Sequence, residues 1–454
     1  MPPVLTFDRG TLLLEGLPDD EIPPAFVYDD RVHLHRAPAM AYHDVVWALH
    51  RRKQPWEDRA RAYGVLGRPH RAWRQPRPYQ EEALADWNAA GRRGVVVLPT
   101  GAGKSLVAEM CIAAADRDVL VVAPTLELVA QWYAALVRAF GEPVGVLGGG
   151  RHEVHPITVS TYDSAWMLIE RYGDRFGLLV FDEVHHLPGP SYGLAASCSI
   201  APWRLGLTAT LERPDGDHQL LAELVGPVVH ARSIRELAGE FLAPYRTEVL
   251  DVFLSDEERA AYDQATATYR AFREARGIGS GRGGFQHFLR EAGRSREGRE
   301  AFAAFRATRR IVHQTPRKLE LLAEILLEHA GARCIVFTND NATAWTVSRT
   351  FLVPAITHRT DPKERRVLLD AFAAGTLPVL VTSRVLNEGV DVPEAEVAVV
   401  MSGSGTVREH VQRLGRILRP VEGKQAVLYE LVVADTVEER TSARRRDHEA
   451  WQDG

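Results

Sequence analysis

Cysteine is scarce in this sequence, with three residues among 454. They stand far apart, and each has apolar neighbours: Cys111, Cys198 and Cys334. Scattered cysteines of this kind favour reduced thiols in the protein core over a disulfide framework or a zinc cluster. The chain also lacks a run of about eighteen apolar residues, and its start, MPPVLTFDRG, lacks the segments of a secretory signal. We therefore expect no membrane span, no secretion and a cytoplasmic location.

An overall excess of positive charge is absent as well, since the formal net charge is -5. The total does not point to a nucleic-acid binder, but affinity for phosphate depends on the local field. Residues 269–310 contain eleven Arg and four Glu, a local excess of seven positive charges. This segment is the clearest basic patch of the chain.

Short apolar segments alternate with helix-like stretches through most of the chain. From residue 95, the segments GVVVLP, VLVVAP, ITVS, LLVFDE and RLGLTAT are typical of buried strands. The rhythm returns after residue 315 with RCIVFTN, LPVLVTS and EVAVVMS. Strands that alternate with helices indicate parallel sheets covered on both faces.

These patterns predict an α/β protein of several domains. Residues 1–66 are expected to form a small N-terminal α+β domain, followed by one α/β domain over 67–230 and another over 231–454. The Arg-rich segment 254–312, interrupted by GIGSGRGG, is predicted to be a helical hairpin inserted in the second α/β domain.

The segment LPTGAGKS at residues 98–105 lies between an expected strand and an expected helix, which is the context of a phosphate-binding loop. Its glycines let backbone N–H groups turn toward phosphate oxygens, Lys104 supplies positive charge, and Ser105 offers a hydroxyl to Mg²⁺. Leu98 stands where the usual pattern has glycine. A turn that only caps a helix is the alternative. The residues expected to hold the nucleotide are Thr100, Gly101, Ala102, Gly103, Lys104 and Ser105.

The segment LLVFDEVHHLPG at residues 178–189 places two carboxylates and two imidazoles directly after an apolar strand. Ligands of parallel sheets gather at the carboxyl ends of strands, so Asp182 is expected to hold Mg²⁺ near the same phosphates. Glu183 is expected to orient or deprotonate the attacking water, and His185 or His186 to sense the nucleotide. A zinc site is the alternative, but neither the H-E-x-x-H spacing nor a cysteine partner is present.

The order of further motifs resembles the superfamily 2 helicases and translocases, in which two RecA-like domains bind one ATP. The motifs are RPYQ, APTLELVAQW, VSTYDS, GLTAT, IVFTND, VTSRVLNEGVDVPEA and QRLGRILRP, which lie between residues 77 and 431. The resemblance implies ATP and Mg²⁺ as cofactors and a fold of two tandem RecA-like domains. It also implies base or nucleotide contacts at Arg77, Gln80, His185, Asp391 and Gln412.

The same resemblance implies roles for residues outside the phosphate-binding loop. Arg416 and Arg419 lie three residues apart in the expected arginine-finger motif, where they would stabilise charge on the γ-phosphoryl group. An arginine row on a solvated helix face is the alternative. Nucleic-acid contacts are implied at Pro124, Thr125, Thr161, Tyr162, Thr338 and Thr382.

Within that superfamily the chain is most similar to the XPB family of DNA helicases. The N-terminal segment resembles that family's damage-recognition domain, DEVH matches its second motif, and the basic hairpin lies where the family carries a thumb. Two departures exist: LERPDG follows GLTAT where an Arg-Glu-Asp element is expected, and LNEGVDVP is more similar to restriction-enzyme motors. We expect an ATP-dependent DNA helicase or translocase of 3′-to-5′ polarity in DNA repair or processing.

Alternatives remain open at this point. The chain could translocate on duplex DNA for a nuclease or repair partner, bind damaged DNA with a regulatory ATPase, or act on RNA. In the hairpin, Arg273, Arg282 and Phe285 are expected to contact single-stranded, forked or duplex DNA by phosphate neutralisation and base stacking. The competing interpretation is that its aromatic residues pack within the chain.

Overall fold

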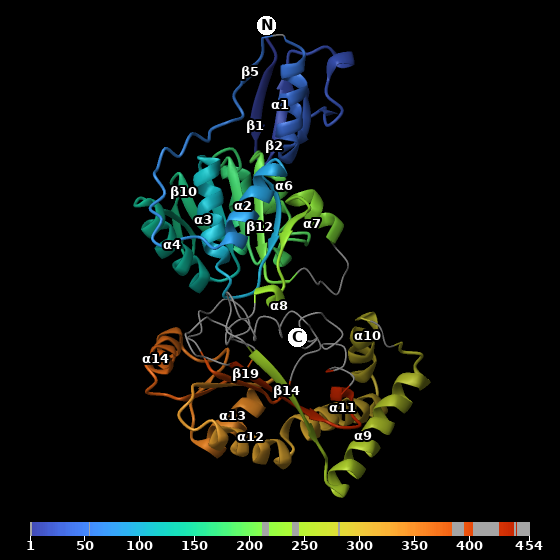
Figure 1. The fold of residues 1–454 in the computed structure, drawn as a ribbon. Coiled ribbons are helices and arrows are strands. Elements are labelled where there is room, and N and C mark those ends of the chain that lie inside the picture. Colours follow the sequence, from blue (N-terminus) through green and yellow to red (C-terminus); the bar gives the residue numbers. More distant parts are fainter. Residues whose placement is uncertain are drawn as a thin grey trace. The chain divides into compact units, whose positions relative to one another are not determined.

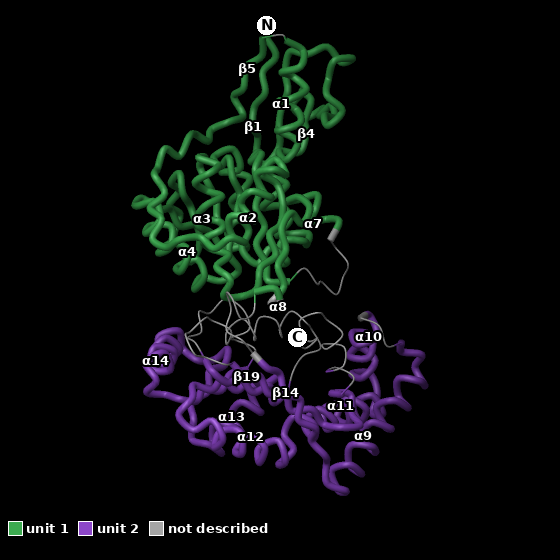
Figure 2. The backbone as a smooth tube through the Cα atoms, viewed as in Figure 1, with its two compact units in different colours: residues 1–237 green, residues 238–454 purple. Residues whose placement is uncertain are grey.

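A computed structural model describes residues 2–53, 55–210, 218–237, 245–279, 282–383, 395–402, 426–439 and 442. The chain divides into two compact units, residues 1–237 and 238–454 (Figure 2). Each unit is described by itself. The division falls seven residues later than the sequence indicated, because the last strand and a short helix of the first unit extend to Leu237.

The first unit begins with a small mixed sheet of five strands in the order β3-β4-β2-β1-β5 (Figure 1). Its neighbours are antiparallel except for β1 and β5. One face is covered by α1, whose buried residues Tyr42, Val45 and Leu49 join Leu5 and Leu12 in a core. The elements are β1 Val4–Asp8, β2 Thr11–Glu15, β3 Val27–Asp29, β4 Leu34–Pro38, α1 Tyr42–Arg51 and β5 Glu57–Asp58.

The larger sheet of the first unit has eight strands in the order β13-β6-β12-β11-β7-β10-β8-β9. All neighbours are parallel except the hairpin of β8 and β9. The strands are β6 Arg93–Val97, β7 Val119–Ala123, β8 Gly145–Gly148, β9 Arg151–Glu153, β10 Ile157–Thr161, β11 Leu178–Asp182, β12 Trp203–Thr208 and β13 Val228–Ala231. The five strands expected from apolar runs are present. The hairpin and β13 were not predicted, because glycine and exposed polar residues hide their pattern.

Helices connect the strands of this sheet (Figure 1). They are α2 Pro78–Ala89, α3 Lys104–Ala115, α4 Leu126–Phe140, α5 Tyr162–Tyr172, α6 Leu194–Ser197, α7 His218–Leu224 and α8 Ile234–Leu237. Because β6, β7, β10, β11 and β12 are parallel, the residues that follow them lie at one edge of the sheet. Every motif of the first unit that carries charge or a hydroxyl lies at this carboxyl edge.

The small N-terminal domain packs against the opposite, amino edge of that sheet. Ile200, which precedes β12, belongs to the core of the N-terminal domain. Gly10 lies so close to Cys198 that a Cβ atom at Gly10 would be 2.7 Å from the Cys198 Cβ. The two sheets therefore share an apolar contact instead of being joined by the chain alone.

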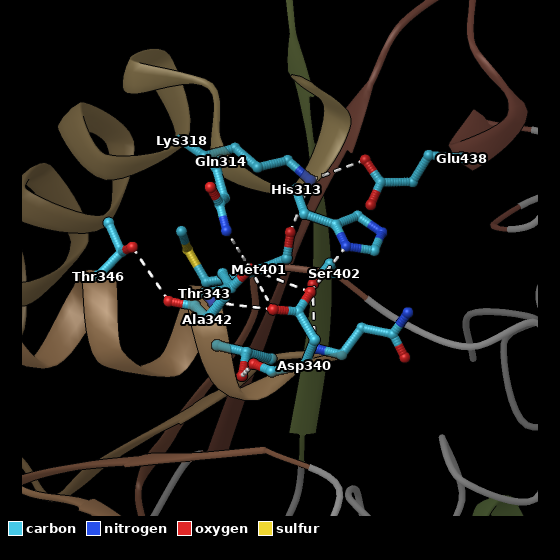
Figure 3. Close-up of polar contacts among 12 residues, drawn as sticks. His313, Gln314, Lys318, Asp340, Ala342, Thr343, Thr346, Met401, Ser402 and Glu438 are labelled. Carbon is cyan, nitrogen blue, oxygen red and sulfur yellow. Dashed lines mark hydrogen bonds and ion pairs between the residues drawn. The ribbon is translucent and has the colours of Figure 1, made fainter. Parts of the chain in front are cut away.

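The second unit contains a parallel sheet of six strands in the order β14-β19-β18-β15-β17-β16. Its strands are β14 Tyr245–Val252, β15 Cys334–Phe337, β16 Ala355–Ile356, β17 Val379–Thr382, β18 Val397–Val400 and β19 Ala426–Val433. The connecting helices are α12 Pro316–Glu328, α13 Asn341–Phe351 and α14 Pro362–Ala373. A buried ion pair of 2.7 Å between Lys318 and Glu438 joins α12 to the segment after β19 (Figure 3).

The inserted segment forms three helices instead of the expected hairpin: α9 Asp256–Ala275, α10 Arg282–Ala292 and α11 Arg296–Gln314. The chain leaves α10 at Gly293, and the hydroxyl of Ser295 then accepts a hydrogen bond from Gly298 N at 2.9 Å as the cap of α11. A helix stop followed by a new N-cap explains the third helix.

Cys111 and Cys334 are buried, and Cys198 is half-buried with a free thiol like the other two. Burial raises the pKa of the Cys334 thiol to about 12. The expectation of reduced core thiols is therefore confirmed for Cys111 and Cys334. Among the described residues, no helix combines the length and apolar character needed to cross a membrane.

Candidate nucleotide and nucleic-acid sites

The phosphate-binding loop connects β6 to the first residue of α3. Gly101 and Gly103 have φ values of 85° and 80°, which side-chain-bearing residues rarely adopt. Gly103 is the N-cap of α3, and a Cβ atom there would come within 2.5 Å of Gln80 Nε2. Glycine is thus required at position 103 both by backbone conformation and by the close approach of α2.

The side chains at the start of α2 are tied to this loop. Gln80 is 3% exposed, accepts a hydrogen bond from Arg77 N at 2.9 Å and donates one to Ala102 O at 2.8 Å. Tyr79 also donates its hydroxyl proton to Ala102 O at 2.8 Å. The structure therefore places Gln80 directly against the loop, with its carboxamide engaged inside the protein, and Arg77 beside Gln80 and Tyr79 at the start of α2.

Lys104 lies at the N-terminus of α3, and its ammonium donates to Leu98 O at 3.2 Å and Pro99 O at 3.4 Å. The hydroxyls of Thr100 and Ser105 belong to half-buried residues on either side of it. The positive charge of Lys104 acts on the Asp182 carboxyl, which shows that the loop and the end of β11 face one another.

Asp182 is the last residue of β11 and is 8% exposed. Its Oδ2 accepts a hydrogen bond from Trp132 Nε1 at 2.8 Å, and its Oδ1 accepts one from Glu183 N at 3.0 Å. Burial raises the pKa of the Asp182 carboxyl, while the Trp132 hydrogen bond and the charge of Lys104 oppose the rise. The carboxylate is therefore fixed in orientation beside a cation.

Glu183 has a left-handed backbone conformation, with φ 47° and ψ 53°, which is unusual for a residue with a side chain. Its Oε2 lies 3.4 Å from His185 Nδ1, and that nitrogen lies 3.1 Å from Thr208 Oγ1 at the end of β12. The Thr208 hydroxyl donates to Thr210 O at 2.8 Å, so it can only accept from His185. His185 thus carries its proton on Nδ1 and links the acidic motif to GLTAT.

His186 contributes differently. Its ring packs against Tyr162 and His185, with centroid distances of 6.0 and 4.3 Å. Its positive charge, when present, acts on the Asp182 carboxyl. These ring contacts give His186 a packing role beside the acidic motif.

Two of the residues expected to contact nucleic acid are helix caps at the carboxyl edge. The Thr125 hydroxyl accepts from Leu128 N at 3.2 Å at the start of α4, and Thr161 accepts from Ser164 N at 3.1 Å at the start of α5. Pro124 precedes the first cap and is half-buried. The strands before these helices, β7 and β10, are neighbours, so both helix N-termini lie at one place.

Tyr162, Thr338 and Thr382 are almost fully buried and hydrogen-bond within the protein, so their expected contacts with DNA stay predictions that their side chains do not favour. Tyr162 is 1% exposed and donates its hydroxyl proton to Asp182 O at 2.9 Å. Thr338 and Thr382 are 0% exposed, and their hydroxyls donate to backbone carbonyl oxygens. Tyr162 thus supports the end of β11, and the two threonines support backbone at the ends of β15 and β17.

The inserted helices resolve the two interpretations of their aromatic residues. Tyr269, Phe272 and Phe288 form a core with Phe302 and Phe305, as the packing interpretation required. Phe285 differs, because it is 42% exposed while its ring lies 5.4 Å from that of Phe305.

Among the arginines expected to contact DNA, Arg273 is half-buried and donates hydrogen bonds to Ile278 O and Gly279 O. These bonds, both from Nη2, close the loop after α9, and the expected contact of Arg273 with DNA stays a prediction. The side chain of Arg282 and the residues Asp391, Gln412, Arg416 and Arg419 lie outside the described residues.

Family models match three parts of the chain. The Xeroderma pigmentosum group B helicase damage recognition domain matches residues 5–60. The res subunit of type III restriction enzymes matches residues 74–213, and the helicase conserved C-terminal domain matches residues 317–421.

Curated relatives decide the family. The DNA 3'-5' translocase XPB2 of Sulfurisphaera tokodaii is 43% identical over 372 residues, which cover 82% of this chain and 84% of the relative. The chain belongs to the XPB family of DNA helicases. XPB helicases of Kineococcus radiotolerans and Mycobacterium tuberculosis are each 32% identical, and the matches cover 82% and 83% of this chain but 62% and 64% of those proteins.

Solved structures show the same fold at lower identity. The Hef helicase domain of Pyrococcus furiosus has a TM-score of 0.54 and 21% identity, covering 84% of this chain and 100% of that one. Dbp5 of S. cerevisiae has a TM-score of 0.56 and 15% identity, covering 84% and 89%. The expected architecture of two RecA-like domains with a small N-terminal domain is confirmed.

The XPB-family site includes residues that sequence reasoning missed. Trp132 holds Asp182, Tyr79 holds Ala102, and Thr208 receives the proton of His185. All three lie within or next to recognised motifs, but the residues that they contact are 23 to 50 positions away. Only the fold brings these pairs together.

Proposed function

We propose that this chain is an ATP-dependent DNA helicase or translocase of 3′-to-5′ polarity that acts in DNA repair or processing. The observation that carries the proposal is the continuous chain of contacts from the phosphate-binding loop through Asp182 and Glu183 to His185 and Thr208. Family membership supplies the substrate class and the polarity, since relatives are named as 3'-5' DNA helicases and translocases.

The residues present suit Mg²⁺ with ATP. Mg²⁺ is held by one or two protein oxygens together with phosphate oxygens and water, and the Asp182 carboxylate and Ser105 hydroxyl supply such oxygens. When bound, the ion would neutralise charge on the β and γ phosphates. Lys104 would bind the same phosphates, and Gly101 and Gly103 would turn backbone N–H groups toward them.

Glu183 would orient and deprotonate the attacking water. Its unusual backbone conformation places its carboxylate 3.4 Å from His185 Nδ1. A change in the charge or position of this carboxylate would therefore move His185, which contacts Thr208. Arg416 and Arg419 belong to this proposal through the family motif alone, as do Asp391 and Gln412. They would complete the site from the second RecA-like domain.

One DNA strand would cross the carboxyl edge of the first sheet. The N-termini of α4 and α5 carry partial positive charge, and their caps, Thr125 and Thr161, are neutral hydroxyls. Glu127 and Asp163 in the first turns offset part of this charge. The inserted helices would add an electrostatic contact. Their exposed arginines are Arg270, Arg276, Arg290, Arg294, Arg296, Arg299, Arg306, Arg309 and Arg310.

The test is a Glu183→Gln variant, which keeps the shape of the side chain but removes the base. We expect DNA-stimulated ATP turnover to fall by about 10²–10⁴-fold, the usual contribution of a general base, while ATP still binds. The matched control is Glu153→Gln on the exposed strand β9, which should hydrolyse ATP at the normal rate. Normal turnover by Glu183→Gln would contradict the mechanism.

A second candidate is a motor that moves on duplex DNA without separating its strands. The relative from Sulfurisphaera tokodaii, which is named a translocase, favours it. A strand-displacement assay beside a triplex-displacement assay separates the two, since a pure translocase removes only the third strand. A nuclease or repair partner would then use the movement.

A further inference from the structure

The chain between β5 and α2 includes a strap, defined here as residues 64–77, which belongs to no helix or strand and runs along the side of the first RecA-like domain (Figure 1). Backbone hydrogen bonds fix its first half. Gly67 N donates to Asp116 Oδ1 at 2.8 Å. Arg71 N donates to Ala139 O at 2.7 Å. The strap ends at the N-cap of α2, so it leads directly to the helix that contacts the phosphate-binding loop.

Glu109 of α3 lies against the second half of this strap and is 0% exposed. His70 Nε2 lies 3.6 Å from Glu109 Oε2, slightly beyond hydrogen-bond distance, and neither carboxylate oxygen has a closer donor among the described residues. Burial raises the pKa of the Glu109 carboxyl, while the charges of Arg74 and His70 oppose the rise. A buried carboxylate keeps its charge only beside compensating charge, and here that charge comes from the strap.

Aromatic contacts place the cationic groups of the strap. The Arg74 guanidinium lies 4.0 Å from the centroid of the Trp73 ring, and the guanidinium of Arg138 on α4 lies 4.6 Å from the same centroid. Both distances are typical of cation–π contacts. The ring of His70 packs against Phe140 at the end of α4, with a centroid distance of 5.3 Å. The strap therefore contacts α4 through packing and α3 through charge.

The position of Arg74 affects the start of α2, because Arg77 follows only three residues later. Three residues span at most about 11 Å, so a shift of Arg74 moves the backbone of Arg77. Arg77 N donates to the Gln80 carboxamide at 2.9 Å, and that carboxamide donates to Ala102 O at 2.8 Å. The charge of Glu109 is thus connected through the strap to the two residues that are expected to contact the base.

We propose that Glu109 is a positioning residue for recognition of the adenine base of ATP. Its charge attracts Arg74 and His70 and so holds the strap. The strap in turn sets the position of Arg77 and Gln80. The inference rests on the proposed function and on the base contacts expected of these two residues. It adds a residue that touches no part of the nucleotide, and it predicts that loss of this charge weakens base recognition and spares phosphate binding.

The experiment measures DNA-stimulated ATP turnover with GTP as a competitor, which gives kcat, the KM for ATP and the inhibition constant of GTP. Glu109→Gln keeps the shape of the side chain and removes its charge. We expect the KM for ATP to rise about five- to tenfold, equivalent to about one lost hydrogen bond to the base, with kcat and the GTP constant nearly unchanged. A folding defect would instead lower kcat and weaken both nucleotides.

Arg74→Gln tests the same interaction from the exposed strap without altering the core. It should raise the KM for ATP by a similar factor, and the double variant should be no worse than either single variant, because both changes break one interaction. Glu109→Asp keeps the charge and should recover part of the ATP affinity. Arg71→Gln is the matched control, since Arg71 lies on the same strap beside Gly141, and it should keep the normal KM.

Three results would overturn the proposal: an unchanged KM for ATP in Glu109→Gln, an equal loss for ATP and GTP, or fully additive effects of Glu109→Gln and Arg74→Gln. Failure of the proposed function gives different results in the unaltered chain. If GTP binds as tightly as ATP there, the base contacts expected of Arg77 and Gln80 are wrong. If DNA does not stimulate ATP turnover there, the motor itself is wrong.

Discussion

Thr208 is the residue at which the acidic motif and GLTAT meet. Its hydroxyl donates to Thr210 O at 2.8 Å, accepts from Thr210 N at 3.3 Å and accepts from His185 Nδ1 at 3.1 Å. All of these groups are buried. A hydroxyl with one donor and two acceptor positions filled has a fixed direction, so a movement of His185 is transmitted to the strand end.

Thr208→Val keeps the shape of this side chain but removes all three hydrogen bonds. Leaving the buried Thr210 O without its donor costs about 1–3 kcal/mol. We expect DNA-stimulated kcat to fall about tenfold, with the KM for ATP nearly unchanged, as measured in a coupled ATPase assay. Thr350→Val, at an exposed position of α13, is the control. If Thr208→Val lowers only ATP affinity, the coupling role is wrong.

Individual site residues could be predicted from the sequence where charged residues directly follow an apolar strand. Asp182 and Glu183 could be placed at a strand end because LLVF precedes them. The hydrogen bond from the Trp132 indole to Asp182 could not be predicted from the sequence, because Trp132 lies on a helix 50 residues earlier in the chain. A DNA contact at Tyr162 was implied by the family motif VSTYDS, but its position on the inner face of α5 buries the side chain.

Among the elements, α13 differs from α4 and α5 at its N-terminus. Its cap is Asp340, whose carboxylate accepts from Thr343 N at 2.9 Å and from His313 Nδ1 at 3.1 Å (Figure 3). A carboxylate already occupies the positive end of this helix, so a DNA phosphate would meet repulsion there. The expected backbone contact at Thr338, which lies just before this helix, stays a prediction.

The contribution of the Asp340 cap to stability should depend on pH. Burial would raise the pKa of Asp340, but hydrogen bonds from His313 and Thr343 N lower it to about 2, from 3.8. A depressed pKa means that the stabilisation is present above about pH 4 and is lost as the pH falls toward 2. Because the carboxylate side chain is 42% exposed, screening limits the effect to about 1 kcal/mol.

Urea unfolding between pH 5 and 2.5 measures this effect. We expect Asp340→Asn to be less stable than the unaltered chain at about pH 5 and to approach it at about pH 2.5. Asp361→Asn changes the cap of α14 and keeps the His313 pair, so it serves as the control. A constant difference across this range would show that the Asp340 charge does not contribute.

The periodicity of apolar residues predicted most helices and strands, but the residues at which they begin and end were harder to predict. Strand β19, Ala426–Val433, was missed although it is buried throughout, because AVLYELVV carries a central Glu. That Glu430 accepts a hydrogen bond from Ser442 at 3.0 Å, a contact made only after folding. The inserted segment shows the same limit, since Ser295 was recognised neither as a stop nor as a cap.

At the scale of the first unit, the N-terminal domain and the RecA-like sheet form one packed body. Ile200 lies in the N-terminal core, Cys198 meets Gly10, and a Cβ at Gly173 would be 3.0 Å from Phe7. Removal of the N-terminal domain would expose this apolar surface. A truncation before residue 66 would therefore confound a loss of DNA preference with a loss of stability, and point substitutions are better tests.

Gly10→Ala tests whether the two sheets unfold together. Gly10 has φ 81°, and an added Cβ would be 2.7 Å from Cys198 Cβ, so both backbone strain and a clash with the RecA-like domain are introduced. Gly67→Ala is a matched control, since Gly67 has φ 61° and nothing within 4 Å of its added Cβ. The backbone strain of about 1–2 kcal/mol is common to both variants, whereas the clash belongs to Gly10→Ala alone.

We expect Gly10→Ala to be about 1–3 kcal/mol less stable than Gly67→Ala, the usual cost of overpacking. For a unit of this size, that difference lowers Tm by roughly 2–10 °C, measurable by scanning calorimetry. If the N-terminal domain and the sheet are one cooperative body, the whole transition of the first unit shifts. Equal Tm values, or a separate transition for the small domain, would mean that the contact between Gly10 and Cys198 does not couple the unfolding of the two sheets.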